Sequence, residues 1–294
     1  MRRLIALLLL FAVTGALIAA AGLWFFGAAA PSLGRPMILT LELDQELPEH
    51  DYEAALPFLE PDDRPTLAKL YRGLSAARRD PAVLGVALTI QDAAFGLAKA
   101  EELRRELIAV GAAGKRVACY LETAGEGSNG TLEYYLATAC DEIALAPAGE
   151  VNLLGFYLDS PFLRGGLDKL KIEPSFLTAG EFKSAGESFT ETAHSPAARE
   201  ALEAVLDSLY LRLVDDIASR REVDAATVRA WIDRAPHPAE DALALGLVDA
   251  LAFPDEFRAS LDAWGEGDAR RVELLDYARG AAAGSPVGAK IAVV

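Results

Sequence analysis

The feature that most constrains the fold of this chain is an alternation of short, continuously apolar runs with longer segments of helical periodicity. After the strand-like run MILTLELD, the run LGVALTI at 84–90 has the length of a strand and no polar face, as is typical of parallel sheets covered on both sides. A helical pattern at 97–110, a strand at 116–122 and a helix at 131–140 follow. This order predicts an α/β fold with a parallel sheet built from right-handed βαβ units.

The C-terminal part of the sequence is predicted to be largely helical. A helix is expected to begin at Ser195, whose hydroxyl suits a helix cap, and Pro196 suits the first turn. Helical periodicity then continues to about residue 247, and ALGLVDAL at 244–251 returns the chain to a strand or turn.

The N-terminal segment, residues 1–30, is predicted to be a transmembrane anchor. Residues 4–26 form a run of 23 residues without a charge, which is long enough to span a bilayer as a helix. A pair of arginines precedes the run and favours a cytoplasmic N-terminus with the body of the protein outside. A cleaved signal peptide is the alternative, since Ala28-Ala29-Ala30 suits a signal peptidase, but the apolar run is longer than usual for one.

Composition and motifs exclude several classes of function. The net charge is −16 with no block of basic residues, which argues against nucleic acid as a partner. Cys119 and Cys140 stand in apolar segments and are interpreted as small buried residues without a bond partner. No CxxC pair, HExxH, GxSxG, GxGxxG or phosphate-loop motif is present, so neither a metal nor a cofactor is expected. Ser128, in a glycine-bounded turn, is interpreted as a turn or cap residue, with a nucleophile as the alternative.

Lys183 is the candidate catalytic residue. It lies in TAGEFKSAGESFTE at 178–191, among small and apolar neighbours, after an expected strand PSFLTA. Burial among apolar groups favours the neutral form of a lysine amine, which can then act as general base toward a serine hydroxyl. The alternative is a surface lysine paired with Glu181 or Glu187. Ser184 is a poor partner, because adjacent side chains on an extended segment point to opposite faces.

Around this lysine the sequence resembles the bacterial signal peptide peptidase A family of the long, two-repeat type. The resemblance rests on GEFKSAGESFTETAHSPAARE, on DEIALAPAGEVNLLGF and GLDKLKIEP before it, and on ALALGLVDAL after it. It implies a crotonase/ClpP-like α/β fold in which Lys183 is the general base of a serine/lysine dyad. The serine nucleophile of the family lies in a second repeat. The resemblance also implies peptide substrates, namely remnant signal peptides, and assembly into homo-oligomers.

The resemblance divides the chain into three parts. Residues 1–30 are the anchor, 36–279 the lysine-bearing repeat, and 280–294 a linker and the first strand of a second repeat, because IAVV parallels the opening of the body. The turn after the strand at 84–90 reads QDAAFGLAKAEEL and contains no serine. We therefore expect a serine endopeptidase held in the bacterial inner membrane by a single span, with its body in the periplasm, and inactive without the second repeat.

Two other hypotheses compete with this interpretation. The chain could be a catalytically inactive half that serves as an assembly or binding module for a serine-bearing partner. It could also be a crotonase-type acyl-CoA enzyme of the same fold. The predicted anchor and the FKSA stretch argue against the acyl-CoA enzyme.

Overall fold

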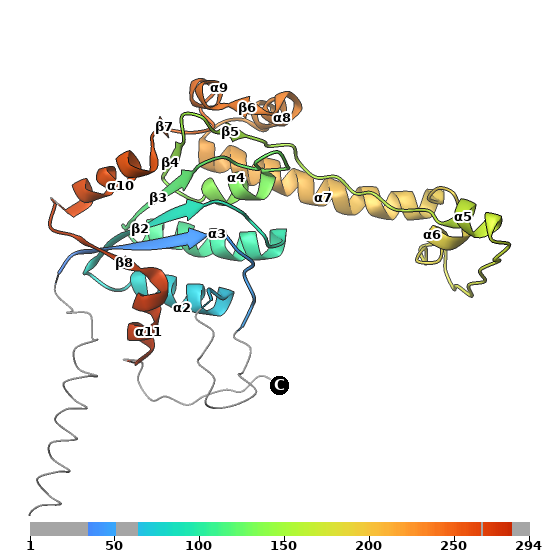
Figure 1. Cartoon of the computed structure of the whole chain (residues 1–294), viewed down its shortest axis with the longest axis horizontal. Coiled ribbons are helices and arrows are strands. Elements are labelled where there is room, and N and C mark those ends of the chain that lie inside the picture. The colour runs from blue at the N-terminus through green and yellow to red at the C-terminus, as the bar shows by residue number, and fades with distance from the viewer. Residues whose placement is uncertain (1–34, 51–63, 266, 284–294) are drawn as a thin grey trace, which may run out of the picture.

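The computed structural model describes residues 35–50, 64–265 and 267–283 of the 294-residue chain. Its centre is a six-stranded sheet of order β7-β4-β3-β2-β1-β8, in which every neighbouring pair is parallel (Figure 1). The strands are β1 (Met37–Leu43), β2 (Val83–Ile90), β3 (Arg116–Leu121), β4 (Glu142–Leu145), β7 (Ala250–Leu251) and β8 (Arg270–Glu273). The predicted α/β fold with a parallel sheet is confirmed.

Two cores form on the two faces of the sheet because successive strand residues point to opposite sides. In β3, Cys119 and Leu121 join the larger core, whereas Ala118 and Tyr120 join the smaller one. The helices that contribute to the larger core are α2 (Leu67–Ala77), α3 (Leu97–Ala112), α4 (Thr131–Ala137), α7 (Pro196–Arg221), α8 (Ala225–Arg234), α9 (Ala239–Ala244) and α11 (Leu274–Ala283). The smaller core lies under α10 (Pro254–Asp262), which is followed by the 3₁₀ helix η1 (Ala263–Gly265).

A small antiparallel pair, β5 (Glu150–Val151) with β6 (His237–Pro238), lies beside α8 and α9 at the top of Figure 1. Strand β6 interrupts the region that was predicted to be helical from Ser195 to about residue 247. The C-terminal part is therefore a series of separate helices rather than a continuous run. Only Ala250–Leu251 of the predicted segment 244–251 forms a strand.

A long arm projects from the body of the molecule (Figure 1). We define the arm as residues 157–212, which include α5 (Arg164–Lys169), α6 (Glu187–Thr190) and most of α7. Within α7, the residues toward its C-terminal end pack into the larger core, among them Leu213 and Ile217, while the N-terminal half extends away from the body. The predicted strand PSFLTA is absent: residues 174–179 have no regular structure and no neighbouring strand.

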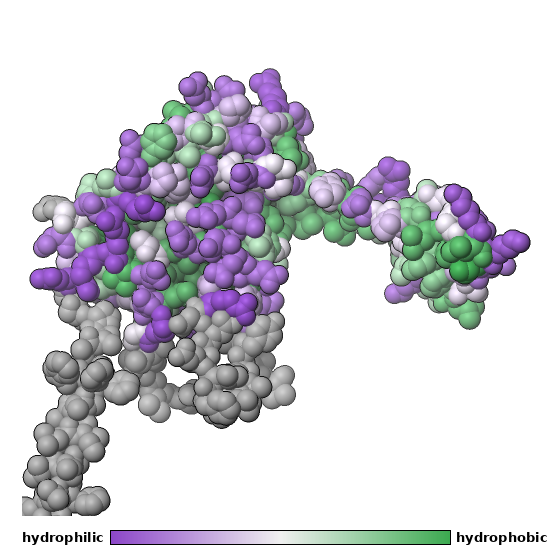
Figure 2. All heavy atoms as spheres, in the orientation of Figure 1, coloured by the Kyte–Doolittle hydropathy of each residue, from purple (hydrophilic) through white to green (hydrophobic). Residues whose placement is uncertain are grey.

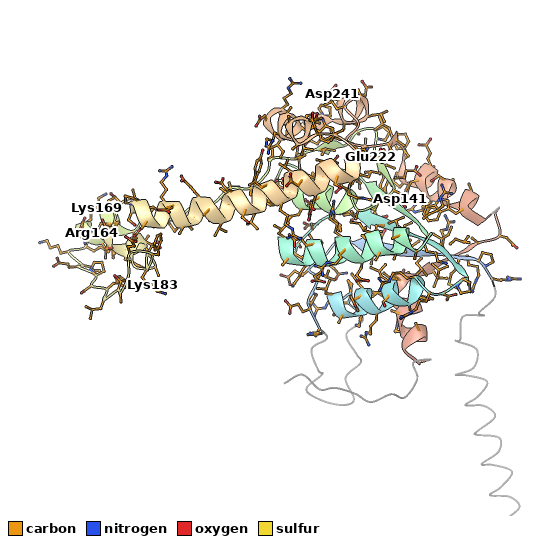
Figure 3. The ribbon with its side chains drawn as sticks, turned by 180° about the vertical axis from the view of Figure 1, so that it is seen from behind. Asp141, Arg164, Lys169, Lys183, Glu222 and Asp241 are labelled. Atoms are coloured by element: carbon orange, nitrogen blue, oxygen red, sulfur yellow. A yellow bond between two sulfur atoms is a disulfide. The ribbon has the colours of Figure 1, made fainter. Side chains whose placement is uncertain are left out.

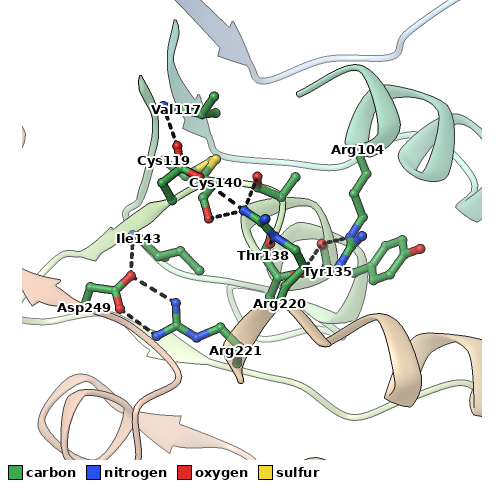
Figure 4. Close-up of a disulfide and its surroundings, with 12 residues drawn as sticks. Arg104, Val117, Cys119, Tyr135, Thr138, Cys140, Ile143, Arg220, Arg221 and Asp249 are labelled. Atoms are coloured by element: carbon green, nitrogen blue, oxygen red, sulfur yellow. Dashed lines mark hydrogen bonds and ion pairs between the residues drawn. A yellow bond between two sulfur atoms is a disulfide. The ribbon is translucent and has the colours of Figure 1, made fainter. Parts of the chain in front are cut away.

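Arginines at the end of α7 join the arm to the body (Figure 4). The Arg221 guanidinium donates to both carboxylate oxygens of Asp249, at 2.7 and 3.0 Å, and Asp249 also accepts the backbone N–H of Ile143 in β4. Arg220 donates to the backbone carbonyls of residues 138–140. The direction in which α7 leaves the body is thus fixed by charged groups that bind backbone of the sheet region.

The interpretation of the cysteines as unbonded residues was wrong, because Cys119 and Cys140 form a disulfide with 5.9 Å between their Cα atoms (Figure 4). Both residues are buried, as expected. They meet because β3 and β4 pair in parallel with Cys119 opposite Ile143, and Cys140 lies just before β4. Apolar patterns along a sequence indicate burial, but they do not show which residues become neighbours across strands.

Among the residues that the structure describes, no helix combines the length and the apolar composition needed to cross a bilayer. The predicted anchor at 1–30 lies outside the described residues, and so does most of the predicted linker at 280–294.

Candidate active site: the lysine-bearing arm

Lys183 lies at the far end of the arm, in the turns that precede α6 (Figure 3). Its backbone N–H donates to the carbonyl of Gly180 at 3.2 Å, and Gly180 has a φ of +97°, a left-handed conformation that favours glycine. The Lys183 side chain is exposed. The apolar burial that the sequence suggested for this lysine is therefore not provided by the chain itself.

The expected alternative, a surface ion pair with Glu181 or Glu187, does not form. Within the described part of the chain, Lys183 has no ion pair with either carboxylate, whereas Glu187 is bound by Ser195. The segment around Lys183 is also turned rather than extended. The argument that excluded Ser184 from an extended geometry therefore does not apply to this structure.

A small aromatic cluster holds the lysine-bearing turn. The rings of Phe176 and Phe189 stack with 5.7 Å between their centroids, and Phe162 meets His194 edge to face at 4.9 Å. Gly186 is buried against Phe176 so closely that an added Cβ would lie 2.8 Å from the Phe176 Cγ. A side chain at this position would push the turn off the aromatic ring.

Glu187, His194 and Ser195 form a polar cluster next to the turn. The Ser195 hydroxyl donates to Oε1 of Glu187 at 2.6 Å, and the Ser195 backbone N–H donates to Oε2 at 3.0 Å. His194 Nδ1 lies 3.8 Å from Oε2. These contacts, the hydrogen bonds from Ser195 first, hold the pKa of Glu187 below its usual range. The predicted role of Ser195 as helix cap is confirmed, since its hydroxyl also accepts the N–H of Ala198.

The surface of the arm is unusually apolar. Figure 2 shows hydrophobic side chains gathered at its far end, and Tyr157 near its base is 78% exposed. The other large apolar residues that the arm exposes are Leu158, Leu163, Leu170, Ile172, Phe176, Leu177, Phe182, Phe189, Val205, Leu209 and Leu211. Large exposed apolar patches are typical of surfaces that contact other proteins or membranes.

Ser128, the alternative nucleophile, is not near Lys183. It is exposed in the turn between β3 and α4, where its backbone N–H donates to Gly125, and this turn belongs to the body (Figure 1). Lys183 is at the opposite end of the arm (Figure 3). The described part of the chain therefore does not bring this serine and this lysine together.

Two features of the body were not anticipated from the sequence. A hollow of about 910 Å³ opens on the α10 side of the sheet, lined by Thr40, Thr89 and Tyr120 among others. Burial raises the pKa of the Tyr120 hydroxyl, which has no hydrogen-bond partner among the described residues. On the other side, Glu133 is buried and accepts the N–H of Ala93 at 3.2 Å, and burial raises the pKa of its carboxyl group. Neither signal is visible in local sequence patterns.

The described residues contain no group of His, Cys, Asp or Glu side chains that could hold a metal ion. The chemistry that this arrangement offers is thus that of an amine on an apolar arm, attached to a parallel α/β body. These features define the class of the protein, an α/β protein with a long arm whose apolar side chains are exposed.

The chain belongs to peptidase family S49, whose model matches residues 112–266. Its relatives include the chloroplastic serine protease SPPA of Arabidopsis thaliana, 28% identical over 213 residues, which cover 72% of this chain and 31% of that protein. Protease 4 of Salmonella typhi is 32% identical over 158 residues, covering 49% of this chain and 26% of that protein. A putative signal peptide peptidase SppA of Enterococcus faecium is 24% identical, covering 64% and 53%. The resemblance to signal peptide peptidase A is confirmed.

The chain spans less than a third of the length of the Arabidopsis and Salmonella relatives that it matches. Among solved structures, a mutant of the 1510-N membrane-bound stomatin-specific protease aligns with a TM-score of 0.44 and 12% identity, covering 81% of this chain and 98% of that one. An enoyl-CoA hydratase/carnithine racemase from Magnetospirillum magneticum aligns with a TM-score of 0.36 and 16% identity, covering 75% and 66%.

Proposed function

We propose that the chain is the lysine-bearing part of a membrane-anchored serine endopeptidase that degrades remnant signal peptides. Lys183 is its general base, and the nucleophilic serine belongs to a second crotonase/ClpP-like repeat outside this chain. Membership of family S49 supports the serine protease, and the relatives named signal peptide peptidase support the substrate class. The FKSA stretch supports the assignment of Lys183.

The observation that carries the proposal is the position of Lys183, exposed at the end of an apolar arm. A lysine surrounded by water is charged and has no basic lone pair to offer. When the arm packs against a serine-bearing surface, side chains such as Leu177 and Phe182 are buried around the amine, which favours its neutral form. The active site is therefore completed by assembly.

In the assembled site, the neutral Nζ of Lys183 accepts the proton of the serine hydroxyl while the serine Oγ attacks the carbonyl carbon of the peptide. The resulting ammonium donates this proton to the nitrogen of the leaving amine as the C–N bond breaks. A water molecule, deprotonated in turn by the lysine, then hydrolyses the acyl-enzyme and regenerates the serine.

The proposal includes the bacterial inner membrane as location, with residues 1–30 as a single-pass anchor and the body in the periplasm. The Cys119–Cys140 disulfide supports a body outside the cytoplasm, because such bonds persist in oxidising compartments. The anchor would hold the site next to substrates whose apolar segments remain in the bilayer. The apolar arm also supports a homo-oligomer, in which arms and bodies of several copies cover one another.

The second candidate is an inactive assembly module that binds a serine-bearing partner. The same apolar arm favours it, since docking through the arm requires no chemistry at Lys183. Both candidates require the arm to bind a serine-bearing surface, but only the first requires Lys183 to act as a base.

The test is hydrolysis of peptides with an apolar signal-type core by the chain combined with a serine-bearing second repeat, as the proposal requires. Replacing Lys183 by alanine is expected to lower kcat by about 10²–10⁴-fold, the usual contribution of a general base. The matched control is Lys169→Ala, because Lys169 is an exposed lysine on the same arm (Figure 3). If Lys183→Ala were as active as Lys169→Ala, the peptidase proposal would be contradicted. If the wild-type protein assembled but hydrolysed no peptide, the assembly module would be favoured.

A further inference from the structure

The Glu187 carboxylate joins the lysine-bearing turn to the first turn of α7. Both of its oxygens accept hydrogen bonds from one residue, Ser195: Oε1 from the hydroxyl at 2.6 Å and Oε2 from the backbone N–H at 3.0 Å. Ser195 is at the same time the cap of α7. The Glu187 carboxylate thus binds the N-terminal cap of the 26-residue helix α7, which lies eight residues later in the chain.

The environment of Glu187 keeps this carboxylate in the form that accepts both bonds. Its side chain is only 16% exposed. The donors from Ser195 and the nearby ring of His194 lower its pKa, so it is ionised at neutral pH. Hydrogen bonds to an ionised acceptor are roughly twice as strong as neutral ones.

Lys183 lies four residues before Glu187, and the backbone between them is folded into turns. The N–H of Glu187 donates to the carbonyl of Ser184 at 2.9 Å, and the N–H of Lys183 donates to Gly180. Gly186 rests against Phe176. Aromatic packing and backbone hydrogen bonds hold the turn itself, and the Glu187 carboxylate ties it to the first turn of α7.

An ion pair between Glu187 and Lys183 is a different role for the same carboxylate, and the geometry opposes it. Both oxygens of Glu187 are engaged by Ser195, and no ion pair joins Glu187 to Lys183 in the described chain. Such a pair would also hold the amine in its charged form, which cannot act as a base.

We propose that Glu187 is a positioning residue for Lys183, which it holds at a fixed place relative to α7 through Ser195. The inference rests on the proposed function, since it assumes that Lys183 is the general base. α7 is in turn joined to the body by Arg220 and Arg221. Contacts therefore run without a break from the sheet region to the lysine-bearing turn.

The experiment uses the complete, serine-bearing protein with Glu187→Ala and Glu187→Gln. Glu191→Gln is the matched control, because Glu191 is an exposed carboxylate at the other end of α6. For Glu187→Ala we expect kcat to fall about 10²-fold with KM within twofold of wild type, since a displacement of about 1 Å of a reacting group costs this much. Glu187→Gln retains one acceptor oxygen and is expected to recover part of the loss. Rates are expressed per folded protein, measured by circular dichroism, so that unfolded protein does not count.

Amide hydrogen exchange, read by mass spectrometry over residues 180–190, reports on the turn without reference to activity. Exchange in this segment is expected to be at least about tenfold faster in Glu187→Ala and unchanged in Glu191→Gln, because exchange follows local opening. Unchanged kcat in Glu187→Ala, or unchanged exchange, overturns the positioning role. If Lys183→Ala is inactive at the same time, the proposed function stands without it. If Lys183→Ala is fully active, the proposed function fails, and the positioning role fails with it.

Discussion

Removal of the disulfide between Cys119 and Cys140 is expected to lower the free energy of unfolding by about 3 kcal/mol. The two cysteines are separated by 21 residues, and closing a loop of this length restricts the unfolded chain by about this amount in the chain-entropy model. Both side chains are buried, so the change acts inside the larger core. For a body of this size, 3 kcal/mol corresponds to about 6–12 °C in melting temperature.

The variant is Cys119→Ala with Cys140→Ala, compared with the oxidised wild type by urea and thermal unfolding followed by circular dichroism. Thiol titration of the denatured, unreduced wild type should find no free thiol, since both described cysteines are in the bond. Reductant is the internal control: it should destabilise the wild type and leave the double variant unchanged. Equal unfolding midpoints for the two proteins, or two free thiols in protein from an oxidising compartment, would refute the reasoning.

Three further changes test the body and the arm. Arg221→Met leaves Asp249 without its guanidinium partner and should cost about 2 kcal/mol in urea unfolding, less than a fully buried pair because the Asp249 side chain is 36% exposed. A cost below about 0.5 kcal/mol, the range of a surface ion pair, would contradict the role of this pair. Burial raises the pKa of the Glu133 carboxyl above its unfolded value of 4.5, so the folded protein keeps this proton to higher pH than the unfolded chain does. The free energy of unfolding of the protein therefore falls as pH rises from about 4 toward neutrality. The difference in urea midpoint between Glu133→Gln and wild type should therefore grow in favour of the variant as pH rises through this range. Parallel curves of midpoint against pH would contradict the raised pKa of Glu133. Gly186→Ala places a Cβ against Phe176 and should speed hydrogen exchange at the end of the arm while the melting temperature of the body stays the same; unchanged exchange would mean that the turn tolerates the methyl group.

The prediction of the sheet succeeded because its signal is local. An apolar run such as 84–90 needs cover on both faces wherever it folds, and the runs and helices follow each other at the spacing of βαβ units. Ser195 and Pro196 likewise act on the backbone within a few residues, and the helix begins there. The prediction of PSFLTA as a strand was wrong because a strand also needs a partner, and residues 174–179 have none.

The sequence by itself determined the α/β class, the start of α7 and the peptidase family, and its prediction of Lys183 as the base stays a prediction. Only the tertiary structure decided that Cys119 meets Cys140, that Glu187 binds Ser195, and that the arm carrying Lys183 extends from the body with its apolar surface uncovered. The physical reason is the distance along the chain over which each interaction acts. Periodicity, caps and turn residues act over a few residues of chain, whereas cross-strand neighbours and the direction of a helix depend on how distant elements pack.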